Sequence, residues 1–288
     1  MSTTGKKWLT GCGIGCGLFL LVLAGLGTFG YFAVRDVVDK AKDIDAGRAA
    51  VDSVFGEPTD FTPSATGVVP GRRVEVFLDI REDMAPWREQ MDELLTTLDG
   101  KGPGGVLGKI RAGIKFVPTI MSFINTRDQT MVASGMGLGE YHYLYCLTYY
   151  GLLDKDPADG PGFSLIDENA PQNEGVRVKT RFAHKDSVSV RDRRRRTLER
   201  MINRVQREIL ANQLAALQTD SLQTTELAGW RDSLAAEVEA MNRNPLRLPW
   251  QDGLPDRISD SLAPYRDRLE PLYDPLTSGL EMGLTGKD

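Results

Sequence analysis

An uncharged apolar stretch near the N-terminus constrains this chain more than any other feature. Residues 8–34 read WLTGCGIGCGLFLLVLAGLGTFGYFAV and contain no charged side chain. As an α-helix this stretch would extend about 40 Å, enough to cross a hydrocarbon core of about 30 Å with some tilt. We therefore expect a short tail (1–7), a transmembrane anchor (8–34), a juxtamembrane helix with a linker (35–71) and a helical soluble domain (72–288).

Two other interpretations of the first residues are open. Val22-Leu23-Ala24 resembles the small-residue cleavage site of a signal peptide, but the apolar run continues to Val34. Leu9-Thr10-Gly11-Cys12 resembles a lipoprotein motif, but the apolar region follows the cysteine, whereas a lipoprotein signal needs it to precede. We expect an uncleaved anchor.

The orientation of the anchor follows less directly from the sequence. Lysines at 6 and 7 flank the short side, and four basic residues between 35 and 48 flank the long side. The count of basic residues therefore favours neither orientation clearly. Long domains are translocated largely regardless of charge, so we expect a single-pass protein of the cell envelope with an extracytoplasmic domain. A cytoplasmic domain is the alternative.

Four glycines inside the apolar stretch form two pairs spaced four residues apart. Gly11 pairs with Gly15, and Gly13 pairs with Gly17. Such spacing lets two membrane helices approach closely, which predicts a homodimer or a membrane-protein partner. The alternative is a glycine-rich span without a helical partner.

Helical periodicity dominates the chain after the anchor and predicts a mainly α-helical domain of five or six helices. Between 72 and 98, alternation favours a strand, but the 3–4 spacing of Val74, Phe77, Arg81 and Met84 favours a helix with a restart at Pro86. Further helices are expected over 107–121, 130–153, 191–217, 227–241 and, broken by prolines, 258–280. Two short alternating runs predict a small β-hairpin within 176–190.

The expected helix 130–153 is the most unusual soluble stretch, because it is apolar nearly all round and carries five tyrosines. Such a helix is typical of the centre of a core. Glu140 and His142 lie among the tyrosines and are the only, weak, catalytic candidates; two residues apart, they do not share a helical face. With the long loop 154–175 this helix could form an enzyme pocket. The alternative is a satisfied polar network inside a bundle.

No cofactor or metal motif is complete. The glycines at 135, 137 and 139 follow no predicted strand, and Gly108-Lys109 lacks the rest of a phosphate-binding loop. The acids of 154–160 resemble the start of a calcium loop, but their spacing is wrong and no glutamate stands twelfth. We expect neither a metal nor another cofactor.

Four consecutive arginines, Arg193, Arg194, Arg195 and Arg196, form a candidate patch for an anionic partner. The alternative is a solvated basic face paired with the chain's own acids. The formal net charge of −5 argues against a protein that mainly wraps nucleic acid, so no nucleic acid is expected. With the anchor, the helical pattern and the incomplete motifs, the sequence predicts a membrane-anchored, non-enzymatic protein that binds or scaffolds a protein partner.

Overall fold

The structure is a computed structural model that describes residues 46–98, 105–159, 163–164, 179–180, 188–219 and 225–282. The described residues belong to one compact unit that spans 44–288. The expected anchor 8–34 and its four glycines lie outside the described residues. Among the residues described, no helix combines the length and the apolarity that crossing a membrane requires.

The protein is mainly helical, as the sequence predicts. A helix over 46–55 comes first. The longer elements that follow are α2 (Gly71–Asp83), α3 (Ala85–Leu98), α4 (Gly105–Ala133), α5 (Leu138–Tyr145), α6 (Val188–Thr219) and α7 (Thr225–Arg243). The short helices are α8 (Asp256–Leu262), α9 (Arg266–Leu269) and α10 (Ser278–Glu281), with 3-10 turns η1 (Pro58–Asp60), η3 (Ala263–Tyr265) and η4 (Glu270–Leu272). The described part therefore holds more helices than the five or six expected, because several expected helices are broken.

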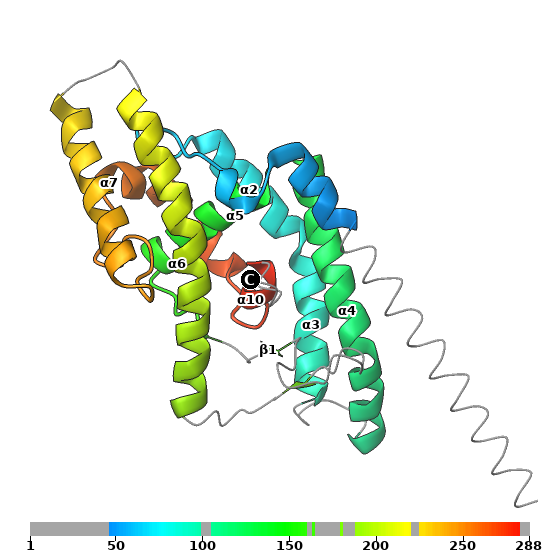
Figure 1. Ribbon diagram of the computed structural model, residues 1–288. Helices are drawn as coiled ribbons and strands as arrows, with labels where there is room; N and C mark the ends of the chain where they lie inside the picture. Colours follow the sequence, from blue (N-terminus) through cyan, green and yellow to red (C-terminus); the bar gives the residue numbers. More distant parts are fainter. Residues whose placement is uncertain are drawn as a thin grey trace, which may run out of the picture. The chain divides into compact units, whose positions relative to one another are not determined.

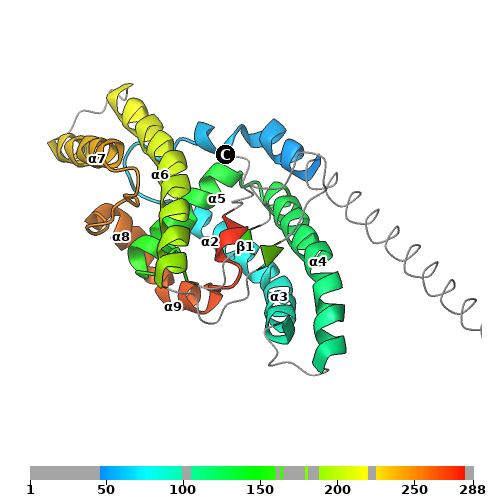
Figure 2. The ribbon, with the colours of Figure 1, turned by 60° about the horizontal axis from the view of Figure 1, so that its bottom comes forward.

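Two helix pairs flank the tyrosine-rich segment. In Figure 1, α3 and α4 lie side by side on the right, and α6 and α7 lie side by side on the left. The segment of α5 lies between the pairs and contacts α2 and α6, and Figure 2 shows the same order from below. The main core takes residues from α2, α5, α6, α7 and α8, and a smaller cluster lies between α3, α4 and the C-terminal Leu280.

The predicted helix over 72–98 is confirmed, with its restart. Helix α2 ends at Asp83, and α3 begins at Ala85. Pro86 is the second residue of α3, where a helix has no intrahelical partner for the amide that proline lacks. The proline therefore separates two helices and does not disrupt either.

The prediction of one helix over 130–153 is wrong. Residues 130–133 are the last turn of α4, which ends at Ala133, and Gly135 with a φ of +65° follows it. The amide of Met136 donates to the carbonyl of Met131 across this glycine, a common way to end a helix. The chain then forms α5 and a π-helix, η2 (Cys146–Leu152). The predicted burial of this segment is confirmed, since all five tyrosines are buried.

The predicted hairpin within 176–190 is also wrong. Residues 188–190 open helix α6. Strand β2 (Lys179–Thr180) pairs antiparallel with β1 (Phe163–Ser164), which lies in the expected loop 154–175. Short alternating runs do not distinguish a strand from the first turn of a long helix, and the register of so short a pair is not specified by the sequence pattern.

The C-terminal segment is broken at its prolines, as predicted. Pro264 and Pro271 each stand in the first turn of a 3-10 helix, and Pro275 precedes α10. These breaks let the chain turn back so that Leu280 and Glu281 are buried.

Candidate functional site

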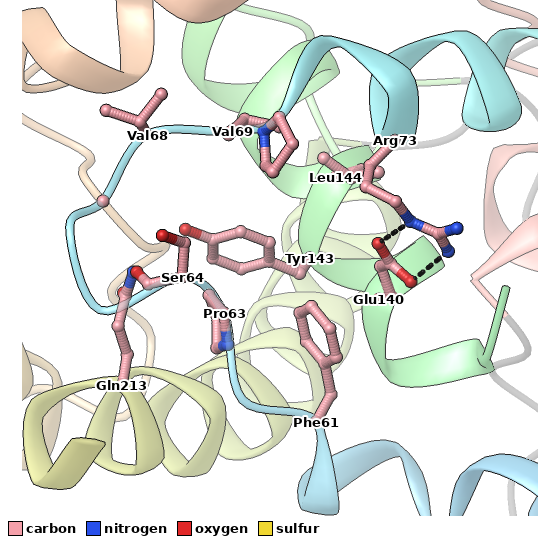
Figure 3. A pocket seen from close by; sticks show the side chains of 12 residues that line it. Phe61, Pro63, Ser64, Val68, Val69, Arg73, Glu140, Tyr143, Leu144 and Gln213 are labelled. Atoms are coloured by element: carbon pink, nitrogen blue, oxygen red, sulfur yellow. Dashed lines mark hydrogen bonds and ion pairs between the residues drawn. The ribbon is translucent and has the colours of Figure 1, made fainter.

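A shallow cleft lies between the loop 61–70, the start of α2, and helices α5 and α6 (Figure 3). The space it encloses is about 30 Å³, enough for one water molecule, within a depression of about 290 Å³ that includes space open to solvent. Its lining combines apolar side chains with a few polar groups: Phe61, Pro63, Ser64, Gly67, Val68, Val69, Pro70, Arg73, Glu140, Tyr143, Leu144 and Gln213. The enclosed space is too small for a drug-sized ligand, so the feature is a shallow surface depression with a mainly apolar lining and a few polar groups.

An ion pair closes one end of the cleft. The Nε of Arg73 donates to Oε1 of Glu140 over 2.6 Å, and its Nη2 donates to Oε2 over 2.5 Å. The same Nη2 donates to the carbonyl of Gly135, 3.0 Å away. This bidentate geometry uses both carboxylate oxygens of Glu140, which is therefore held as a charged partner of Arg73.

Tyr143 and Gln213 occupy the other end of the cleft. The Nε2 of Gln213 donates to the carbonyl of Ser64 over 2.7 Å. Burial raises the pKa of Tyr143, and its hydrogen bond with Gln213 only partly opposes that rise. The ring of Phe61 lies 5.8 Å from the ring of Tyr143, centroid to centroid. Tyr143 is therefore a neutral, partly polar wall of the cleft.

The loop 61–70 is held in place by side chains of other elements. The indole of Trp230 donates to the carbonyl of Ala65 over 2.9 Å. Gly67 has a φ of +76°, and a Cβ there would lie 2.5 Å from the Trp230 ring, so only glycine fits. Arg257 donates to the carbonyl of Thr66. The outer wall of the cleft is thus pre-formed, with Val68 at its rim 46% exposed.

His142 lies away from the cleft, in the core. Burial, followed by the charges of Arg127 and Arg48, lowers the pKa of His142 to about 3. Its Nε2 has no hydrogen-bond partner among the described residues. The two catalytic candidates are therefore not brought together, because Glu140 faces the cleft and His142 the interior.

The lowered pKa of His142 predicts a pH-dependent stability. The unfolded chain binds a proton at His142 below its ordinary pKa of 6.5, and the folded chain does so only near 3. The neutral His142 therefore contributes fully to the free energy of unfolding above pH 6.5. As the pH falls from 6.5 toward 3, the free energy of unfolding decreases by about 1.4 kcal/mol per pH unit. Urea unfolding of the wild type and His142→Gln between about pH 6.5 and 4 should show a flatter dependence in the variant. Equal slopes would contradict a buried, neutral His142.

A buried charged cluster lies beside the tyrosines. Arg81, fully buried on α2, pairs with Glu281 of α10 and donates to the hydroxyl of Tyr149 over 3.1 Å. Arg88 of α3 also faces Glu281, 3.5 Å away. Burial and the charge of Arg81 lower the pKa of Arg88 to about 10, so it stays protonated at neutral pH.

Arg127 holds the same C-terminal segment from α4. Its Nη1 donates to the carbonyls of Leu280 and Glu281, over 2.8 and 3.0 Å, and its Nε and Nη2 bind Asp128. Three buried arginines therefore clamp α10. The sequence interpretation missed this cluster, although Arg81 stands within the apolar spacing of α2, which was the available signal.

The arginine run is split between two faces of α6. Arg191 pairs with Asp156 and Asp159, both at 2.9 Å, and Arg195 also pairs with Asp156. Arg194 donates to the carbonyl of Ala158. Burial would raise the pKa of Asp156, but the hydrogen bonds from Arg195 and the Ala158 amide lower it overall. These contacts attach the residues 154–159 to α6.

Arg193 and Arg196 are exposed and do not take part in these contacts with residues 154–159. Of the expected pocket loop 154–175, only 154–159 and 163–164 are described. Comparison with protein-family models, with curated proteins and with solved structures finds no match to this chain.

Proposed function

We propose that this protein is a membrane-tethered, non-enzymatic protein of the cell envelope that binds a protein partner at the cleft of Figure 3. The observation that carries the proposal is the state of the two catalytic candidates. Both carboxylate oxygens of Glu140 accept hydrogen bonds from Arg73, and His142 is buried with its pKa lowered to about 3. A carboxylate so engaged and an imidazole without solvent access are structural groups.

The cleft has the composition of a binding surface. Its rim presents the exposed Val68, and behind the rim lie the part-buried Phe61 and the buried Pro63 and Tyr143. Aromatic and arginine side chains are enriched in protein interfaces, and a preorganised surface loses less entropy on binding. The loop 61–70 is held by hydrogen bonds from other helices, which supports a pre-formed site.

The experiment is site-specific photo-cross-linking in the full chain, expressed in the membrane. A photoreactive amino acid replaces Val68 at the rim, and a matched variant carries it at the exposed Ala236 of α7. We expect a cross-linked adduct of one defined mass from position 68 and none from 236. No adduct from 68, or equal adducts from both positions, would contradict binding at the cleft.

A further inference from the structure

Four exposed arginines share one face of α6. Arg193, Arg196, Arg200 and Arg204 follow the spacing of three, four and four residues that places side chains on one side of a helix. At 1.5 Å per residue they extend over about 17 Å. We call these four residues the arginine stripe.

No residue that the structure describes forms an ion pair with a member of the stripe. Asp192 pairs with Arg195 at 3.9 Å, and Glu208 pairs with Arg207 at 2.9 Å. Burial raises the pKa of Glu199, an effect that the charges of Arg195 and Arg196 oppose without reversing it. Asp192 and Glu208 are thus paired with arginines outside the stripe, and Glu199 lies near Arg196 without forming an ion pair among the described residues. The four side chains of the stripe are exposed to solvent.

Charge is segregated between α6 and the rest of the chain. The 32 residues of α6 contain eight arginines and three acids, a net charge of +5. The other 27 basic and 37 acidic residues leave the remainder at −10. A long polyanion that wrapped this protein would meet the acidic remainder, whereas a flat anionic surface can contact the stripe alone.

We propose that the arginine stripe of α6 docks on the headgroups of an anionic bilayer. The stripe is straight, exposed and purely cationic, and contact with a lipid surface requires charge without a complementary shape. Basic residues close to such a surface each strengthen the attraction roughly fivefold, so four together favour it by several hundredfold. The proposal concerns a surface other than the cleft and does not depend on the partner bound there.

The test uses the full chain in nanodiscs of phosphatidylcholine, mixed with separate vesicles and analysed by co-flotation. Vesicles contain phosphatidylcholine alone or mixed with phosphatidylglycerol. The stripe variant is Arg193→Gln/Arg196→Gln/Arg200→Gln/Arg204→Gln. The charge-matched control is Arg72→Gln/Arg231→Gln/Arg243→Gln/Arg266→Gln, which removes four positive charges outside α6. All variants are compared by circular dichroism, and exposed helical positions should tolerate glutamine.

We expect the wild type and the control to float with anionic vesicles at about 0.05 M NaCl and to detach at about 0.5 M, where screening is stronger. Neither should float with neutral vesicles, and the stripe variant should lose at least a hundredfold in partitioning. Replacing all four by lysine should preserve binding, because lipid contact needs only charge. Absence of wild-type binding, binding by the stripe variant, or loss with lysine would overturn the proposal. Loss with lysine would point to a shaped acidic site on a protein.

The outcome is independent of the cross-linking at position 68. An adduct at position 68 without flotation would support partner binding at the cleft and contradict the lipid contact of the arginine stripe. Flotation without an adduct at position 68 would support the lipid contact and contradict partner binding at the cleft.

Discussion

Replacing Glu281 by glutamine should lower the free energy of unfolding by about 3–5 kcal/mol. The carboxylate is 1% exposed and is the counter-ion of two buried arginines, Arg81 and Arg88. It also accepts hydrogen bonds from Tyr141 over 3.2 Å and Thr277 over 2.9 Å. Glutamine keeps the shape but removes the charge, which leaves both guanidinium groups buried without compensation. Urea unfolding followed by the fluorescence of the stacked tryptophans at 230 and 250 measures the change.

Two further variants test the cause of this effect. Glu239→Gln removes a carboxylate that is 61% exposed and pairs with Arg243, and it should change the free energy by less than about 0.5 kcal/mol. Arg81→Met combined with Glu281→Met should be less destabilised than the sum of the single changes, because both charges of the Arg81–Glu281 pair are removed together, although Arg88 stays charged. A loss below about 1 kcal/mol in Glu281→Gln would show that water reaches the cluster.

Replacing Gly139 by alanine should lower the free energy of unfolding by about 3 kcal/mol. A Cβ on this residue of α5 would lie 2.2 Å from the carbonyl oxygen of Pro58 and 2.7 Å from the Cβ of Phe61. The nearest obstacle is backbone, so a side-chain rotation cannot relieve the overlap. Helix α5 would have to separate from η1, which carries the loop 61–70 behind it. Thermal and urea unfolding both measure the loss.

The same substitution at Gly229 should act in the opposite direction. This glycine lies in α7, and nothing lies within 4 Å of a Cβ built on it. Alanine is the better helix former by about 0.5–1 kcal/mol, so Gly229→Ala should stabilise the protein. If the two changes destabilised alike, the close packing at Gly139 would not be the cause.

Several elements of the fold were predictable because their signals are local. The apolar spacing of α2 and α3, the restart at Pro86 and the breaks at Pro264 and Pro271 follow from side-chain periodicity and from the missing amide of proline. The burial of the tyrosine-rich segment was predictable from its apolar composition. Its division into α4, α5 and a π-helix was not, because an apolar segment has no polar face to mark where the period changes.

The candidate site was predictable only in part. Glu140 was singled out because it is a charge among tyrosines, and it does line the cleft. Its partner Arg73 lies 67 positions earlier, and the loop that forms the other wall is packed by residues of α6, α7 and α8. No spacing in the sequence relates residues so far apart.

The sequence by itself determined the helical class, the main breaks, the burial of the tyrosines and the presence of an arginine run. Each of these depends on neighbouring residues within a few turns. Only the tertiary structure decided that His142 is buried, that Glu281 neutralises Arg81, and that the run divides between a face bound to 154–159 and an open face. The physical reason is that an ion pair or a hydrogen bond depends on distance in space, which chain folding sets between residues remote in sequence.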